Sequence, residues 1–191
     1  MAKEILKLRK EHVNFKKLLD MLDAQLDLLH QGEDPDYQLM TDIIYYLIEY
    51  ADTSHHPREE AIFSLLLERD LNLEQDVAEI TRQHNTIAES GARFHEKLES
   101  IINGESEIMQ LQEIEAPGRL CITTLRAHMD KEEKGLFMLA EQLLNNDDWK
   151  KINVKMRPKS DPLFGTNVDE RFLSLCRQLG QAACKNTHDS K

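Results

Sequence analysis

Histidine and glutamate residues interrupt the apolar stripes of this 191-residue sequence, at spacings that could support metal chemistry. The residues are His12, His55 with Glu59, His84, and His128 with Glu132. Each glutamate follows its histidine by four positions, so the two side chains share one face of a helix. A buried histidine, and especially a buried glutamate, is costly unless it is paired or bound to a metal. A single core histidine is usually just hydrogen-bonded, but one in each of four stripes predicts a metal site.

The set of donor atoms indicates which metal would bind. Four imidazoles and two carboxylates are too many ligands for one tetrahedral zinc ion. Mixed nitrogen and oxygen ligation suits iron or manganese better than a metal that prefers thiolates. Two glutamates on different helices can bridge a pair of metal ions, and such inward-facing groups in a four-helix bundle are typical of di-iron carboxylate proteins.

The elements that must position these residues are helices. Apolar residues recur every three or four positions, which predicts four long helices that begin near residues 2, 37, 73 and 107. The first ends near Gly32, the third near Gly104 and the fourth near Asn145. We expect Pro57 to kink the second helix or to break it just after the histidines, and residues 105–116 to form a helical lead-in before Pro117.

The expected fold is all-α, an antiparallel up-down-up-down four-helix bundle with a C-terminal helical extension. The bundle would comprise residues 1–146. The extension, residues 147–191, would contain a Pro-rich and charged connector and one short helix from Val168 to Cys184.

The depth of each histidine along its helix tests this arrangement. At 1.5 Å per residue, His12 and His55 each lie about 27 Å from the end that the first two helices share. His84 and His128 lie about 28 Å and about 31 Å from the same end, provided that Pro117 does not shift the fourth helix greatly. The four histidines and two glutamates should therefore meet at one level inside the bundle.

Several nearby residues compete for the same role. His56 and Glu60 form a second i,i+4 pair, but their face is polar upstream, whereas the face of His55 continues through core residues. We therefore favour His55 and Glu59, with Glu60 outside the ligand set. His95 lies about 16 Å along the axis from His84 and is expected at an end of the bundle. His30 and His188 are expected to be solvated, and ligation by a tyrosine of the group Tyr45, Tyr46 and Tyr50 stays open.

Composition excludes several classes of partner. There are 24 Lys and Arg against 35 Asp and Glu, a net charge of −11, which argues against nucleic acid or an anionic membrane surface as a partner. The first residues lack an apolar signal segment, and no stretch is long enough to span a membrane. Three cysteines (121, 176 and 184) without a C-x-x-C motif argue against a disulfide scaffold. The expected location is the cytoplasm.

Two strings carry a resemblance to a known family. His55-His56-Pro57-Arg58-Glu59-Glu60 and His128-Met129-Asp130-Lys131-Glu132-Glu133 resemble the signature blocks of the hemerythrin-like HHE cation-binding family. The resemblance covers about residues 1–145, and Asp161-Pro162-Leu163-Phe164-Gly165 is similar to the tail of bacterial single-domain members. It implies an antiparallel four-helix bundle holding two Fe ions, oxo- or hydroxo-bridged, that bind or react with O2. Related members handle peroxide or NO, or sense oxygen or iron.

Carried over by position, the resemblance makes His12, His55, His84 and His128 terminal ligands and Glu59 and Glu132 bridges. The sequence departs from the family's oxygen carriers at two places. They have a second histidine four residues after the third-helix one, where this sequence has Ala88, so one iron would lack a nitrogen ligand. Their fourth-helix carboxylate falls five residues after its histidine, which is Glu133 here, although helical geometry favours Glu132.

These features lead to three functional hypotheses. The first is a di-iron protein that binds and reacts with O2, hydrogen peroxide or NO, favoured because an incompletely ligated iron can coordinate a second molecule. The second is a reversible O2 carrier, store or sensor without turnover. The third is an iron-handling protein, ranked low because its relatives carry a thiol motif that this sequence lacks. The sequence identifies neither a reductant nor a protein partner.

Overall fold

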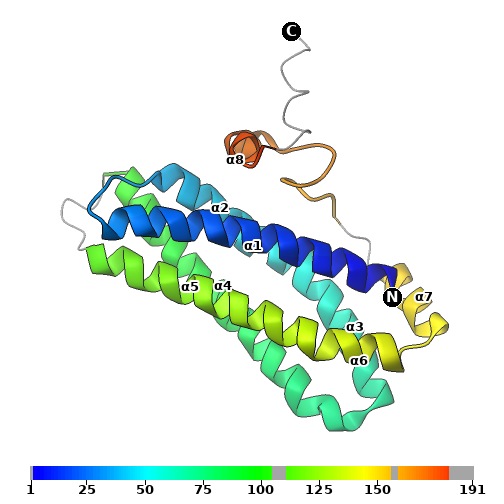
Figure 1. The fold of residues 1–191 in the computed structure, drawn as a ribbon. Helices are drawn as coiled ribbons and strands as arrows, with labels where there is room; N and C mark the ends of the chain where they lie inside the picture. The colour runs from blue at the N-terminus through cyan, green and yellow to red at the C-terminus, as the bar shows by residue number, and fades with distance from the viewer. Residues whose placement is uncertain (1, 105–110, 156–158, 181–191) are drawn as a thin grey trace.

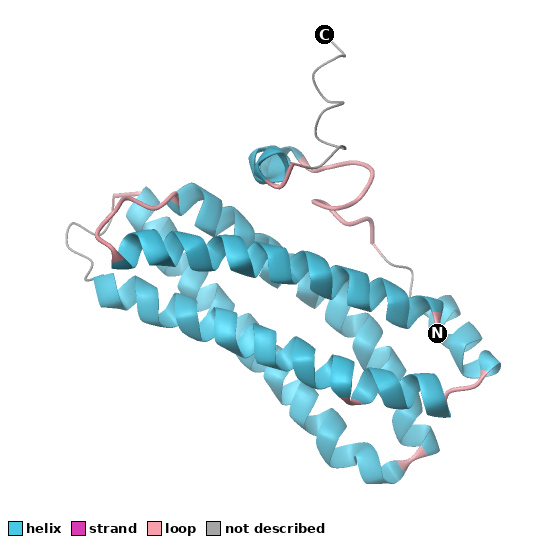
Figure 2. Cartoon of the chain, in the orientation of Figure 1, coloured by secondary structure: helices cyan, strands magenta, loops and turns pink. Residues whose placement is uncertain are grey.

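The computed structural model describes residues 2–104, 111–155 and 159–180, which form helices and connecting loops with no strand among them. The helices are shown in Figures 1 and 2. They are α1 (Lys3–His30), α2 (Tyr37–Tyr50), the π-helix η1 (Ala51–His55), α3 (His56–Arg69), the 3-10 helix η2 (Leu71–Leu73), α4 (Glu74–Ile102), α5 (Leu111–Lys134), α6 (Leu136–Leu143), α7 (Asn146–Lys155), the 3-10 helix η3 (Glu170–Phe172) and α8 (Leu173–Gln178).

The helices enclose two apolar clusters. Helix α1 packs against α2 and α5, and α4 packs against the same two helices, which closes a ring around the core. One cluster includes Phe15, Leu22 and Phe94, and the other, toward the opposite end of α1, includes Leu8 and Phe137. His12 lies between Leu8 and Phe15 on the buried face of α1. The polar residues therefore occupy the level between two apolar layers, where little water can reach them.

The second helical segment is interrupted at the histidines. Helix α2 passes into the π-helix η1, and α3 begins at His56 with Pro57 in its first turn. Proline has no N–H and its ring clashes with the carbonyl four residues earlier, so a proline within a helical segment favours a kink or interruption such as this one. A π-turn adds one residue to the helical path, and these turns are frequent at functional sites. The break expected at Pro57 is present, and it changes which side chains face inward.

The fourth helical segment differs from the sequence expectation. Pro117 lies inside α5 without breaking it, whereas Gly135 separates α5 from α6. A Cβ atom on Gly135 would lie 2.9 Å from the Lys131 carbonyl oxygen, so this break tolerates no larger residue without movement. The expected uninterrupted helix up to Leu143 is therefore wrong at one position. Of the lead-in expected over residues 105–116, residues 111–116 form the start of α5, and residues 105–110 lie outside the described residues.

The described part of the C-terminal extension packs onto the helices. Arg69 of α3 and Asp148 of α7 form a bidentate ion pair, in which Nη2 donates to Oδ1 at 2.7 Å and Nε donates to Oδ2 at 3.1 Å. Leu163 and Phe172 are buried in the first apolar cluster, and α8 lies beside α2. Instead of one helix from Val168, the chain forms η3 and then α8, and residues beyond 180 are outside the described part. Among the described helices, none combines the length and apolar character needed to cross a bilayer.

The cysteines behave differently from one another. Cys121 is a buried free thiol, whereas Cys176 is disulfide-bonded. The argument from sequence against disulfides therefore does not hold at Cys176, because an odd cysteine count still allows one bond. Cys184 lies outside the described residues.

Candidate metal centre

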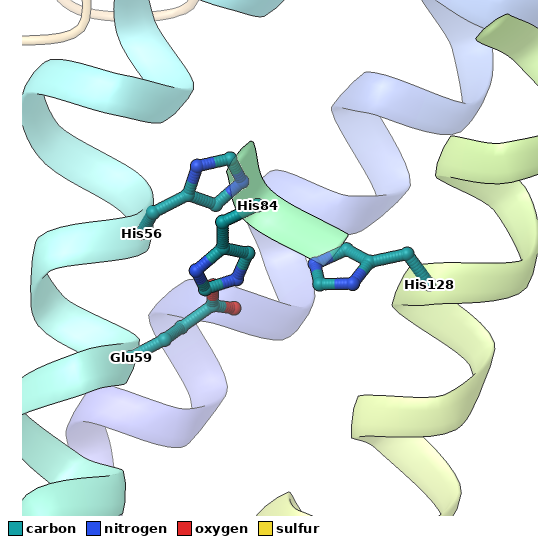
Figure 3. A group of neighbouring side chains, drawn as sticks. All are labelled: His56, Glu59, His84 and His128. Atoms are coloured by element: carbon teal, nitrogen blue, oxygen red, sulfur yellow. The ribbon is translucent and has the colours of Figure 1, made fainter. Parts of the chain in front are cut away.

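Buried histidine and glutamate side chains form two adjoining groups inside the bundle. In the first, one ligand atom from each of His56, Glu59, His84 and His128 lies within 4.8 Å of the others. Figure 3 shows these four side chains pointing toward one another. The second group contains His12, His55 and Glu59 under the same criterion. Glu59 belongs to both groups, so its carboxylate stands between two sites that could each hold a cation.

The two oxygens of Glu59 face different histidines. Its Oε1 lies 3.0 Å from Nε2 of His55 and 3.5 Å from Nε2 of His12. Its Oε2 lies 3.5 Å from Nε2 of His84. One oxygen thus faces each group, which is the arrangement that a bridging carboxylate requires.

Glu132 spans the same two groups from α5. Its Oε2 lies 3.4 Å from Nε2 of His128 and 3.6 Å from Nε2 of His12. Its Oε1 lies 3.6 Å from Nε2 of His84. Like Glu59, it has no solvent exposure. The two carboxylates could therefore bridge a metal pair together.

Every histidine of the cluster is held from its outer side. The Nδ1 atoms of His12, His55, His56, His84 and His128 lie 2.9, 2.7, 3.1, 3.4 and 3.0 Å from oxygens of Glu133, Glu11, Asp52, Glu60 and Gln83, respectively. A ring whose Nδ1–H donates outward leaves its Nε2 lone pair directed inward, and metal-binding histidines almost always have such a partner. Of this outer set, the sequence pointed only to Glu60, which was expected outside the ligand set, and to Glu133, which was considered as an alternative ligand.

Several inward-facing atoms have no hydrogen-bond partner. Both oxygens of Glu59, both oxygens of Glu132, and Nε2 of His84 and of His128 are buried and unpartnered. Leaving a buried polar atom unsatisfied costs about 1–3 kcal/mol, and more if it is charged. Metal cations coordinated by these atoms would remove that cost. The burial and lack of partners of these donor atoms are therefore what a metal-binding site requires.

The negative charges of Glu59 and Glu132 also favour a bound cation. Burial and the negative charge of Glu59 raise the pKa of Glu132 to about 7, because two buried carboxylates repel each other. Burial opposes protonation of His55, but Glu59 and the hydrogen bond to Glu11 outweigh it and raise its pKa to about 9. Burial lowers the pKa of His128 to about 3. In the absence of metal, a proton on Glu132 or on His55 offsets part of the negative charge of the two carboxylates. Bound metal cations would offset that charge in place of protons.

His56 is the residue that the sequence interpretation misplaced. The choice of His55 over His56 assumed an ideal α-helix, in which adjacent residues face different directions. The π-helix η1 ends at His55, and both rings are buried. The His56 ring stacks on that of His84, with centroids 3.9 Å apart. A proline directly after two histidines was the available signal, because it indicates a local change of helical register.

The structure brings all six sequence-predicted residues into this cluster, and of the competitors only His56 joins them. Glu133 is 24% exposed and faces Nδ1 of His12. Tyr46 and Tyr50 donate their hydroxyls to Asp161 and Glu11. The His95 ring contacts Tyr45, the exposed His30 pairs with Glu115, and His188 lies outside the described residues.

Packed helices surround buried imidazole and carboxylate groups that face one another. This arrangement is that of a helical cation-binding protein. The family model of the hemerythrin HHE cation-binding domain matches residues 4–140, so the chain belongs to this family. The resemblance inferred from the two sequence strings is confirmed, and all the cluster residues lie within the matched range. A search among curated proteins gave no significant match.

Proposed function

We propose that the cluster holds two iron ions and that this pair binds and reacts with a small oxidant, namely O2, hydrogen peroxide or NO. One ion would be held by His12 and His55, and the other by His56, His84 and His128. Glu59 and Glu132 would bridge them. The observation that carries this proposal is the set of buried carboxylate oxygens without partners, facing imidazoles whose outer nitrogens are already occupied.

The protein residues prepare the site for this role. An iron pair would supply a binding position for the oxidant and electrons to reduce it. The outer hydrogen bonds orient the rings, and aromatic side chains exclude water: Phe137 stacks on His12 at 5.4 Å and Phe15 contacts His55 at 4.9 Å. The group with His12 and His55 has two imidazoles against three in the other, which leaves it more capacity for an added ligand.

Reversible O2 binding, as a carrier, store or sensor, is the second candidate. The sequence argument for turnover was that Ala88 deprives one iron of a nitrogen ligand. With His56 inside, the cluster contains five imidazoles, so the nitrogen that Ala88 cannot supply has a substitute. This observation weakens the argument from an incomplete iron and favours a carrier or sensor more than the sequence did. We find nothing that favours an iron-handling role.

The deciding experiment has two stages. Protein purified without a metal-affinity tag and loaded anaerobically with ferrous iron should contain about two irons per chain, measured by elemental analysis. The loaded protein is then exposed separately to O2, hydrogen peroxide and NO under an absorption spectrometer. Catalytic loss of peroxide or NO supports the oxidant-consuming role, and an oxygenated spectrum that reverses under vacuum supports the carrier. Zero or one iron per chain, or preferential zinc binding, would contradict the di-iron assignment.

The wider expectations belong to the same proposal. We propose that the four helical segments alternate in direction as an up-down-up-down bundle over residues 1–146, with residues 147–191 as an extension whose helix α8 lies against α2. We also propose a cytoplasmic location, with an electron donor still to be identified.

A further inference from the structure

A cavity of about 240 Å³ lies beside the metal cluster, where the N-terminal half of α1, the start of α3 and the C-terminal extension meet. Its lining includes Lys10, Asn14, Arg58 and Lys159, together with the carboxylates Glu11 and Asp161. The cavity is small for an organic cofactor, since pockets for drug-sized ligands are usually about 300–1,000 Å³. Its size suits a compact molecule.

Both carboxylates of the cavity already have partners. Glu11 is bonded to Arg58 and to Nδ1 of His55. Asp161 accepts the hydroxyl of Tyr46 at 3.0 Å and caps the turn that follows it through the backbone N–H groups of residues 163 and 164. Arg58 therefore balances the charge of Glu11, and the oxygens of Asp161 are occupied by neutral donors.

The cations of the cavity are less fully matched. Lys10 and Lys159 are exposed and form no ion pair with any described residue. Arg58 is only 3% exposed, and its Nε and one Nη are bonded to the Ser54 carbonyl and to Glu11. Its other Nη has no partner among the described residues. Unmatched positive charge at one cavity is unexpected in a chain with a net charge of −11.

Asn14 adds a second, independent observation. The residue is 9% exposed and lines the cavity, and its amide makes no hydrogen bond with the described residues. Its amide atoms are not among the buried side-chain atoms that lack a partner, so they are open to the cavity and available to a ligand. A ligand oxygen in the cavity would satisfy this amide as well as the free edge of Arg58.

We propose that this cavity binds a compact oxyanion with two or more negative charges, such as phosphate or a small dicarboxylate. Arginine binds carboxylate and phosphate oxygens through its planar fork, and lysine adds charge without a fixed geometry. Arg58 and Asn14 would contact the anion directly, and Lys10 and Lys159 would hold its second charge at the mouth.

The position of Arg58 links this cavity to the metal centre. The same guanidinium holds Glu11, and Glu11 accepts the Nδ1–H of His55. An anion bound to Arg58 would weaken the bond between Arg58 and Glu11, which makes Glu11 a stronger acceptor for the Nδ1–H of His55. Occupancy of the cavity should therefore change the electronic properties of the metal that His55 would bind. This coupling rests on the proposed iron centre, whereas anion binding itself does not.

Isothermal titration calorimetry tests the binding. Phosphate and malonate are titrated separately into metal-free and iron-loaded protein at constant ionic strength, with chloride as the reference anion. Saturable binding of one phosphate or malonate per chain is expected, and the preferred anion identifies the source of the charge. Lys10→Ala and Lys159→Ala should each weaken binding about tenfold, and Arg58→Lys should weaken it further. Lys150→Ala removes an exposed lysine of α7 that does not line the cavity, and should change nothing.

Each outcome decides between the alternatives. Binding no stronger than that of chloride, or equal affinity in Lys10→Ala, Lys159→Ala and Lys150→Ala, would overturn the anion site. In the iron-loaded protein the preferred anion should shift the visible absorption bands, and binding without a shift would refute the coupling. If the protein takes up no iron, the proposed function fails, but calorimetry on the metal-free protein still decides whether the anion site exists.

Discussion

At the scale of single residues, the carboxylate of α5 is the sharpest test of the cluster. Glu132 is fully buried with both oxygens unpartnered, whereas Glu133 is 24% exposed and bonded to His12. Glu132→Gln should therefore lose at least half of the bound iron, because an amide cannot bridge two cations. Its neighbour variant Glu133→Gln should lose little. Iron per chain in the two purified variants gives the answer, and the reverse order would mean that the five-residue spacing of the family's oxygen carriers applies here.

His56 allows a second comparison between residues. If it completes the group of His84 and His128, His56→Ala should reduce iron from about two per chain toward one, and should lower the melting temperature, because bound metal stabilises only the folded protein. His95→Ala is the matched control, since that ring lies against Tyr45 and away from the cluster. Equal iron content in both variants, measured by elemental analysis, would remove His56 from the ligand set.

At the scale of the helices, the close packing around α5 allows a prediction about stability. A Cβ atom on Gly118 would lie 2.8 Å from side-chain atoms of Leu26 and Phe94, both of them fully buried. Gly118→Ala should therefore destabilise the protein by about 1–3 kcal/mol, as other overpacked cores show, even though alanine favours a helix. Leu120→Ala on the same helix, 61% exposed, should change stability by less than about 0.5 kcal/mol. Denaturant titration compares the two, and a stabilised Gly118→Ala would show that the packing relaxes freely.

The helices also show which parts of the fold and of the site apolar periodicity can predict. Apolar spacing correctly predicted long helices, and a constant rise per residue brought His12, His55, His84 and His128 to one level. It could not predict the extra residue of the π-helix, because that depends on how Pro57 is accommodated among its neighbours. For the same reason His56 was placed on the wrong face. The break at Gly135 was missed because a helix with one glycine keeps its apolar stripe on both sides.

At the scale of the whole molecule, the cluster should make stability depend on pH in a way that metal removes. In the metal-free protein, burial opposes protonation of His55 and His84, but the nearby carboxylates raise their pKa values to about 9 and about 10. Unfolded histidines titrate near 6.5. The folded state therefore keeps protons that the unfolded state has lost, and stability falls as pH rises from about 7 to about 10.

We expect the melting temperature of the metal-free protein, measured by circular dichroism, to decrease steadily between pH 7 and pH 10. In the iron-loaded protein the same histidines carry metal instead of protons, so the decrease should be smaller over that range. His84→Gln should also flatten the curve of the metal-free protein, whereas His30→Gln, at a ring that is 70% exposed, should leave it unchanged. A metal-free protein whose melting temperature rises from pH 7 to pH 10 would mean that the histidines are neutral in the folded state. The carboxylates of the cluster would then need a metal even at neutral pH.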